Sequence, residues 1–311
     1  MKHCREQTGV ALLTALLVLA LASAIAYALL DNAQRALAAA AASDRGLQAR
    51  QMARGLEEFA LSALHRDGLV DPGVDHLGEP WAGSLPPLPF DRGFVRARVQ
   101  DLDGRLNLNA LVRDDGSPDP VTQARFERLL VELGLPAELK LTITDWIDPD
   151  SQALAGGAED LDYLRERPAY RCPNRALTDA SELLGVRALE PGVWQRLRPF
   201  VATLPRGNPV NLNTAPWQVL AAIVPGIEAD MLERLRPGHQ PWRSVDDFRA
   251  ALVELKLTLA AGQEIGLDVS SRFFLATADV ELDGAGYQFQ ALLERSQNVL
   301  AVRWRQRGAE R

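Results

Sequence analysis

The chain has 311 residues, of which 47% are hydrophobic and 24% are charged, and its formal net charge at pH 7 is -7. This length and composition suit one large folded domain or two ordinary ones. The excess of acidic residues argues against a general nucleic-acid binder, which needs a basic face.

A short basic leader ends at a glycine and precedes an uncharged apolar run. Lys2 and Arg5 lie in the leader, Gly9 ends it, and residues 10–30 carry no charge. A secretory signal peptide has its small-residue cleavage site after the apolar segment, whereas the site-like glycine here precedes it. Cleavage between Gly9 and Val10 would leave the apolar segment on the mature chain, and in this order the sequence resembles type IV pilin-like precursors.

The apolar run is long enough to cross a membrane, because about 20 helical residues cover a hydrocarbon core of ~30 Å. The basic leader precedes it and Asp31 follows it. We therefore expect a single pass through the inner membrane, with the N-terminus cytoplasmic and the body periplasmic. An uncleaved signal anchor is the alternative. Cys4 and Cys172 would lie on opposite sides of the membrane, so we expect no disulfide between them and a buried thiol at Cys172.

Helix-forming residues dominate from Val10 to about His65, and the first proline is Pro72. After Asp31 the apolar residues recur at helical spacing. We predict one continuous helix of roughly 80 Å. Its first half spans the membrane, and its second half lays an apolar stripe on a sheet.

Strand signals stand near the two ends of the remaining chain. Residues 94–101 alternate between apolar and polar side chains, which is typical of a half-buried strand. Residues 272–282 and 287–295 predict a hairpin, which a third strand at 299–305 follows. We expect these segments, with the first extended to residue 112, to form one antiparallel sheet.

Helical patterns separated by Pro, Gly and Asp turns fill the chain between those strands, so the predicted fold class is α+β with a large helical insert. The predicted division is residues 1–9 for the leader, 10–30 for the transmembrane half of the helix, 31–112 and 268–311 for the two parts of a helix-and-sheet domain, and 113–267 for the inserted α-helical domain.

Two short asparagine motifs resemble each other. Residues 107–111 read Asn-Leu-Asn-Ala-Leu, and residues 211–215 read Asn-Leu-Asn-Thr-Ala. Short asparagine side chains satisfy backbone groups in turns and at helix starts. We interpret the repeat as repeated capping chemistry.

An acidic segment is the strongest local candidate for a site. Six carboxylates fall within 18 residues, with no Lys or Arg between them: Asp145, Asp148, Asp150, Glu159, Asp160 and Asp162. Packed together they would repel one another, unless they face water or bind a hard cation such as calcium, which takes 6–8 oxygen ligands. Gly156 and Gly157 would let the chain fold back on itself. A solvated acidic loop and a pair of catalytic carboxylates are the alternatives, and the spacing does not fit an EF-hand.

A helix, a Pro-Gly-Ile turn at residues 225–227 and a second helix resemble a helix-hairpin-helix motif. DNA-binding versions hold phosphate on the backbone amides of the hairpin. Here Glu228 and Asp230 follow the turn and would repel phosphate. We expect a structural or protein-binding copy and no nucleic-acid partner, with membrane-anchored DNA binding and uptake as the alternative function.

Enzyme signatures are otherwise lacking in the sequence. It carries no histidine pair at metal-ligand spacing, no phosphate-binding glycine loop and no nucleophile elbow. We therefore expect a protein that is not an enzyme. A periplasmic hydrolase that uses the acidic segment is a further alternative, without a recognisable nucleophile or base.

Taken together, these features resemble the minor pseudopilin K family of the type II secretion system. The segments that carry the resemblance run over nearly the whole chain: residues 9–14, 75–81, 104–109, 145–148, 157–160 and 211–215. Counting Val10 as the first mature residue, the fifth is Thr14, where most pilin-like proteins have a glutamate. The missing glutamate and the large insert are more specific than the cleavage motif, which all pilin-like proteins share.

The resemblance implies a type IV pilin-like fold, in which the long N-terminal helix packs on an antiparallel sheet and the insert is SAM-like or helix-hairpin-helix-like. It implies that a prepilin peptidase cleaves between Gly9 and Val10 and methylates the new amine. The implied partners are the other minor pseudopilins (I, J and H), the major pseudopilin, the secretin and secreted substrates. The implied cofactor is structural calcium, held by Asp148, Asp150, Glu159 and Asp160, with Asp145 and Asp162 nearby.

The resemblance also links the residue at position 14 to the place of the subunit in a filament. A carboxylate inside a filament core needs a partner, because an unpaired buried charge is costly. In pilin-like filaments, the implied partner is the N-terminal amine of the subunit above. Thr14 removes this need, and a bulky insert would block stacking from above, so both features predict a position at the tip of the pseudopilus.

Overall fold

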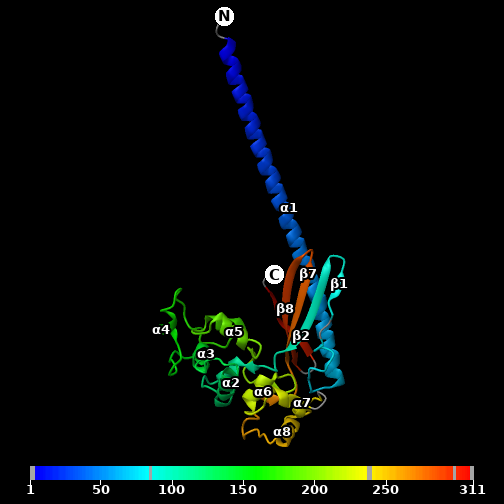
Figure 1. Ribbon diagram of the computed structural model, residues 1–311, viewed down its shortest axis with the longest axis vertical. Helices are drawn as coiled ribbons and strands as arrows, with labels where there is room; N and C mark the ends of the chain where they lie inside the picture. The colour runs from blue at the N-terminus through cyan, green and yellow to red at the C-terminus, as the bar shows by residue number, and fades with distance from the viewer. Residues whose placement is uncertain (1–3, 84–85, 237–239, 297–298, 309–311) are drawn as a thin grey trace.

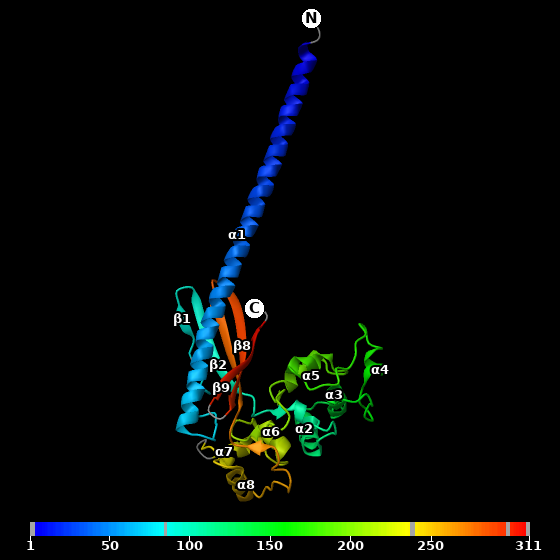
Figure 2. The same ribbon diagram turned by 180° about the vertical axis from the view of Figure 1, so that it is seen from behind.

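The computed structural model describes residues 4–83, 86–236, 240–296 and 299–308. A long helix projects from a body that has two parts (Figure 1, Figure 2). A sheet packs against the lower half of the helix, and a mainly helical insert lies beyond the sheet, on the side away from the N-terminus.

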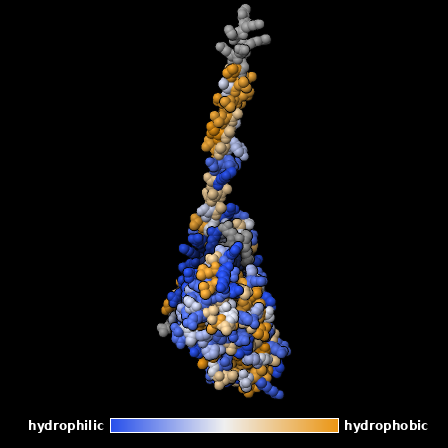
Figure 3. Space-filling view, turned by 90° about the vertical axis from the view of Figure 1, so that its left-hand side faces the viewer, coloured by the Kyte–Doolittle hydropathy of each residue, from blue (hydrophilic) through white to orange (hydrophobic). Residues whose placement is uncertain are grey.

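The projecting element is α1, Cys4–Val70, an unbroken helix of 67 residues that is about 100 Å long. Apolar side chains cover much of its projecting part (Figure 3), where Leu13 and Leu30 are more than half exposed. Among the residues described, this is the one helix long and apolar enough to cross a membrane. The predicted continuous helix is confirmed, and it ends at Val70 rather than near His65.

The sheet has five antiparallel strands in the order β1-β2-β7-β8-β9. Their bounds are β1 Leu88–Phe90, β2 Gly93–Asp101, β7 Phe273–Leu282, β8 Ala285–Ser296 and β9 Val299–Arg307. Asp283 and Gly284 have φ values of 51° and 76°, a turn geometry whose twist matches that of the paired strands. The predicted hairpin, the third strand and their pairing with residues 94–101 are confirmed.

The lower half of α1 lies on one face of this sheet. Ala60 and Leu64 are buried there against Phe274 of β7, because alternate side chains of a strand point to the same face. At the edge of the sheet, Arg305 of β9 donates two hydrogen bonds to the carboxylate of Glu57, at 2.8 and 2.7 Å. Apolar packing and this ion pair together hold the helix on the strands.

The insert leaves the sheet after β2 and returns at β7, although these two strands are paired along all of β2. Its core includes Leu129, Ile143, Leu220 and Phe248, which are fully buried. Its elements in chain order are β3 Leu106–Asn107, η1 Leu108–Leu111, α2 Pro120–Glu132, α3 Leu139–Ile147, α4 Asp160–Tyr163, η2 Ala180–Gly185, α5 Pro191–Leu197, β4 Val201–Ala202, β5 Val210–Asn211, α6 Trp217–Ile223, η3 Ala229–Met231, α7 Leu232–Leu235, α8 Val245–Glu254 and β6 Leu267–Asp268.

The expectation that the sheet extends to residue 112 is wrong beyond the end of β2. β3 pairs in parallel with β4, and Leu106 and Leu108 belong to the core of the insert. The chain passes close to the insert at Gly104, where a Cβ would lie 2.6 Å from Thr214 Oγ1. The alternation of apolar and polar residues around Leu106 and Leu108 suggests a strand of the large sheet. In the structure these residues form a two-residue strand followed by a short 3-10 helix.

The two asparagine motifs occupy equivalent places in two modules of the insert. In each module the first asparagine ends a two-residue strand that pairs in parallel with a later strand, β3 with β4 and β5 with β6. Its side-chain oxygen accepts a hydrogen bond from the backbone nitrogen of the second asparagine. The donor is Asn109 for Asn107, at 3.1 Å, and Asn213 for Asn211, at 2.8 Å.

The second asparagine of each motif fixes a distant loop. Asn109 donates to the carbonyl oxygen of Leu177 and accepts from its nitrogen, at 2.9 and 2.7 Å. Asn213 makes the same pair of bonds with Trp242, at 3.0 and 2.9 Å. The repeat therefore reflects two modules of similar construction, and not local capping alone.

The helix-hairpin-helix-like segment consists of α6, a turn with Gly226 at a φ of 95°, and the short helices η3 and α7. Arg236 follows α7 directly. Its guanidinium donates to the carbonyl oxygen of Asn213 and lies 5.0 Å from the ring centre of Trp242. This basic group is held within the insert rather than presented at the turn, which favours the structural interpretation of the motif.

Candidate metal centre

The acidic segment forms the loop between α3 and α4. Asp148 ends α3 with an extended backbone, and Pro149 follows, which disfavours a further helical turn. Gly156 has a φ of 95°, a conformation that glycine adopts without strain. At Gly157 a Cβ would lie 1.9 Å from Asp145 Oδ2. The two glycines therefore let the loop turn back and pass close to α3.

This path brings three of the six predicted ligands together. Oxygen atoms of Asp148, Asp150 and Glu159 lie within 4.8 Å of one another. Asp148 is 4% exposed and Glu159 is 5% exposed, whereas Asp150 faces solvent. Within the described parts of the chain, Oδ1 of Asp148 and both carboxylate oxygens of Glu159 are buried without a hydrogen-bond partner. Such oxygens are rare in folded proteins, because an unpaired buried polar group is costly.

The negative charges of the loop oppose one another. Burial raises the pKa of Asp148 to about 7, and the carboxylates of Asp150, Asp145 and Glu159 add to the rise. Burial and the charge of Asp145 also raise the pKa of Glu159. A divalent cation would relieve this repulsion and ligate the unpartnered oxygens. A donor set of carboxylate oxygens suits a hard cation, so the residues present fit the calcium ion that the resemblance implies.

Asp145 is a predicted ligand with a different environment. It is fully buried, and its carboxylate accepts hydrogen bonds from the backbone nitrogen of Leu154 at 3.2 and 3.1 Å. Its carbonyl oxygen accepts a bond from Cys172 Sγ at 3.4 Å. Cys172 is the buried free thiol that the sequence predicts, and burial raises its pKa to about 12. Asp145 therefore fixes the loop to α3 and stands next to the group of three.

Asp160 and Asp162 are the remaining predicted ligands, and both pair with arginines. Asp160 forms an ion pair with Arg171 at 2.5 Å. Asp162 forms one with Arg187 at 3.2 Å. The structure places both carboxylates on α4, outside the group formed by Asp148, Asp150 and Glu159.

Asn174 is a candidate ligand that the sequence analysis does not identify. Its φ is 45°, its Nδ2 donates to the carbonyl oxygen of Asp150, and its buried Oδ1 has no partner among the described residues. Its amide lies close enough to Glu159 to lower the pKa of that carboxyl. Asparagine tolerates the left-handed region better than most residues, but no spacing in the sequence ties residue 174 to the acidic loop.

The predicted processing and assembly residues lie in α1. Gly9 and Val10 are part of the unbroken helix, and Val10 is 63% exposed. Thr14 Oγ1 donates to the carbonyl oxygen of Ala11 at 2.9 Å, so its hydroxyl is satisfied within the helix. Residues 1–3 of the predicted leader lie outside the described residues.

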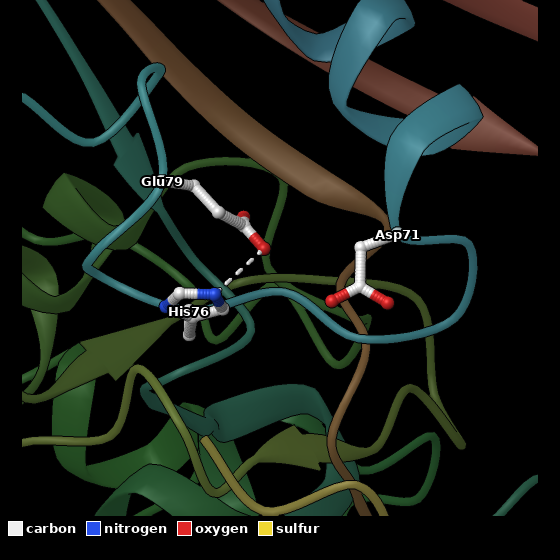
Figure 4. A group of neighbouring side chains, drawn as sticks. All are labelled: Asp71, His76 and Glu79. Atoms are coloured by element: carbon white, nitrogen blue, oxygen red, sulfur yellow. Dashed lines mark ion pairs between the residues drawn. The ribbon is translucent and has the colours of Figure 1, made fainter. Parts of the chain in front are cut away.

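A second cluster of ionisable side chains lies where α1 ends. Figure 4 shows Asp71 beside His76 and Glu79, and ligand atoms of the three lie within 4.8 Å of one another. His76 Nε2 is 3.4 Å from Glu79 Oε1, and His76 Nδ1 accepts a hydrogen bond from the backbone nitrogen of Gly78 at 3.1 Å. A neutral ring that accepts at Nδ1 carries its proton on Nε2, so Nε2 is a donor toward Glu79 and not a metal ligand.

Arginines compensate the carboxylates of this second cluster. Arg243 donates to both oxygens of Asp71, at 2.6 and 2.5 Å, and Arg295 of β8 pairs with Asp75. Burial raises the pKa of Glu79 to about 8, so this carboxyl is mainly protonated at neutral pH. The cluster joins the end of α1 to the sheet and the insert, and two arginines pair with three of its carboxylates, because Arg295 contacts Asp67 as well as Asp75.

Comparison with known proteins gives a consistent set of relatives. Family models of type II secretion system (T2SS) protein K match residues 104–206 and 210–270. The type II secretion system protein K of Pseudomonas aeruginosa is 37% identical over 94% of this chain and 90% of the relative. That of Klebsiella pneumoniae is 33% identical over 97% of each chain.

A solved structure is also similar over most of the chain. It is a chain in the crystal structure of the GspK-GspI-GspJ complex from the enterotoxigenic Escherichia coli type 2 secretion system. The TM-score is 0.75 and the identity 25%, with 86% of this chain and 98% of that chain covered. The two segments matched by the family models divide between β4 and β5, where the two asparagine modules meet.

Proposed function

Because the chain belongs to the type II secretion system protein K family, we propose that this minor pseudopilin occupies the tip of the periplasmic pseudopilus. There it initiates assembly with the other minor pseudopilins and supports export of folded proteins across the outer membrane. Its role is structural and not enzymatic, as in a family of secretion-system pseudopilins.

The observation that carries the tip assignment is the state of Thr14. Its hydroxyl donates a hydrogen bond to the carbonyl oxygen of Ala11 at 2.9 Å. Thr14 therefore needs no hydrogen-bond acceptor from another subunit. A glutamate there would carry a charge that needs a neighbour in the apolar filament core. The insert supports the same position, because it lies at the end of the molecule opposite the N-terminus (Figure 1) and adds bulk where a further subunit would stack.

Processing and topology follow from the N-terminal segment. Prepilin peptidase cleaves between Gly9 and Val10 and methylates the new amine, and α1 anchors the chain in the inner membrane with its N-terminus cytoplasmic and its body periplasmic. The proposed partners are minor pseudopilins I, J and H and the major pseudopilin, with the secretin and secreted substrates nearby. The similar solved structure, a complex with GspI and GspJ, supports the first two.

Calcium is the proposed cofactor, and its role is structural. Asp148, Asp150 and Glu159 would hold the ion, and Asn174 is the additional candidate. The support is their three unpartnered buried carboxylate oxygens and the unpartnered Oδ1 of Asn174. When bound, the ion supplies positive charge that joins the end of α3 to the start of α4. Asp145 would fix the loop next to it through backbone contacts, whereas Asp160 and Asp162 pair with arginines outside the group of three.

The test of the tip assignment compares Thr14→Glu with the uncharged Thr14→Val. Each variant replaces the natural protein in a strain that otherwise makes pseudopili, and gold-labelled antibody locates it along the filaments that form. We expect Thr14→Val to label filament ends as the natural chain does, and Thr14→Glu to label fewer ends, because its carboxylate is unpaired there. If Thr14→Glu enters the filament shaft as readily as it caps the end, the argument from position 14 fails.

A further inference from the structure

A cavity of about 250 Å³ with several charged groups in its lining lies on the seam between the two modules of the insert. Residues of the first module, including Asn107 and Arg125, form one side, and Val210 and Gly266 of the second module form the other. The linker at residues 206–208 completes the lining. The space is large enough for several water molecules or for a small ligand group.

Arg125 of α2 brings a positive charge to this seam without a matching negative one. It is 3% exposed, and its Nη2 donates to the carbonyl oxygen of Gln263 in the second module. Its Nε is buried and has no partner in the described parts of the chain. Burial lowers the pKa of Arg125 to about 10, which leaves it charged at neutral pH. A buried cation with neither a counter-ion nor a full set of hydrogen bonds is costly.

The other charged groups of the lining compensate Arg125 only in part, although the charge of Asp119 raises its pKa. Arg113 and Asp119 pair with each other at 3.0 Å. Arg206 lies 4.0 Å from Asp114, whose side chain is 94% exposed, so solvent weakens that pair. Three arginines and two aspartates therefore line the cavity, and the excess charge is positive although the whole chain is acidic.

Buried polar atoms without partners gather at this cavity. Within the described residues they include Nε of Arg125 and Nε of Arg206, which are donors, and Oδ1 of Asn208, which is an acceptor. Asn208 is 8% exposed. A folded protein rarely leaves several such groups unsatisfied in one place, so they point to an occupant that both accepts and donates hydrogen bonds.

We propose that the cavity on the seam binds a carboxylate group. The planar guanidinium groups of Arg125 and Arg206 can donate paired N–H bonds to the two oxygens of a carboxylate. An N–H group on the same ligand is the matching donor for Asn208 Oδ1. The carboxylate has two possible sources, a free small dicarboxylate or an acidic residue in a peptide segment of another protein.

The experiment uses the full chain in lipid nanodiscs and isothermal titration calorimetry. The probes are sodium succinate, the peptide acetyl-Gly-Glu-Gly-amide and its neutral counterpart acetyl-Gly-Gln-Gly-amide. We expect an acidic probe to bind and the neutral peptide not to bind. Arg206→Gln should weaken that binding at least about tenfold, because a hydrogen bond to a charged group is lost. The matched control is Arg98→Gln, an exposed arginine of β2 that lies outside the cavity.

Arg125→Gln is the second variant, and circular dichroism shows whether it folds. If it does, it should also lose binding at least about tenfold, and if it does not, Arg206→Gln alone decides. Binding of succinate identifies a free carboxylate as sufficient, and binding of the acidic peptide alone identifies a protein segment. The proposal is overturned if neither acid binds at millimolar concentration, if the neutral peptide binds as tightly as the acidic one, or if Arg206→Gln and Arg98→Gln behave alike.

Discussion

Replacing Glu159 with Gln is expected to have opposite effects on stability without and with calcium. Without the ion, the substitution removes one of several opposing charges at a side chain that is 5% exposed. Burial and the charge of Asp145 raise the pKa of Glu159, which means that its ionised form is disfavoured in the folded chain. The free energy of unfolding should therefore rise in the variant. With calcium, the same substitution removes an anionic ligand, and the gain in stability from the ion should fall.

The expected size follows from linkage between binding and folding. A ligand present at 100 times its dissociation constant, and bound only by the folded state, stabilises that state by about 2.7 kcal/mol. For a folded unit of about 150–250 residues, each kcal/mol changes the melting temperature by about 2–4 °C. The natural chain should therefore melt about 5–10 °C higher in saturating calcium than in a chelator, and Glu159→Gln should lose most of this difference.

The assay is thermal unfolding of the full chain in nanodiscs, followed by tryptophan fluorescence in calcium and in chelator. Trp146 is a local reporter, because its ring lies 5.0 Å from that of Tyr163 beside the acidic loop. The matched control is Asp162→Asn, in the same segment but paired with Arg187 at 3.2 Å. It should keep the calcium-dependent shift. The reasoning is refuted if the natural chain folds but shows no shift, or if Asp162→Asn loses the shift as fully as Glu159→Gln.

Two further predictions concern buried polar groups outside the loop. Burial raises the pKa of Glu79 from an ordinary value of 4.5 to about 8, so the folded state binds more protons than the unfolded state between these values, and its contribution to stability falls as pH rises. Glu79→Gln should flatten the curve of unfolding free energy between pH 5 and 8 relative to the exposed control Asp91→Asn, and parallel curves would contradict this. Asn109→Ala and Asn213→Ala should each lower the unfolding free energy by about 3 kcal/mol in urea titrations, because each leaves backbone groups of a distant loop unpaired; a loss near zero for either would refute the equivalence of the two modules.

Local periodicity accounts for the parts of the fold that could be predicted from the sequence. α1 and the β7–β8 hairpin depend on spacings within a few residues, so their patterns are visible without tertiary structure. β3 is different, because Leu106 pairs with Val201 across the whole first module. Because β3 has only two residues, no sequence pattern distinguishes it from a strand of the large sheet. The asparagine repeat was visible in the sequence, but its long-range role depends on loops at Leu177 and Trp242.

The acidic loop could be recognised from its charge. Which of its carboxylates lie together and which pair with arginines could not be predicted from the sequence. Which carboxylates have no arginine partner depends on where arginines from other segments lie. Arg171 pairs with Asp160, and Arg187 pairs with Asp162. Asn174 lies at the candidate site because its backbone turns with a positive φ, and no sequence spacing predicts that turn. A count of acidic residues therefore leaves a solvated loop and a cation site both open, and only the tertiary structure shows which carboxylates lie together.

Charge compensation distinguishes the cluster at the end of α1 from the acidic loop and from the seam between the modules. At the end of α1, arginines pair with Asp71 and Asp75 and compensate much of the negative charge of that cluster. Within the residues that the structure describes, the acidic loop has buried carboxylate oxygens without partners, and the seam between the modules has buried guanidinium nitrogens without partners. The loop and the seam therefore call for ligands of opposite charge. A chelator should change the stability of the loop and leave carboxylate binding at the seam intact, while Arg206→Gln should do the reverse, so the failure of one assignment leaves the other standing.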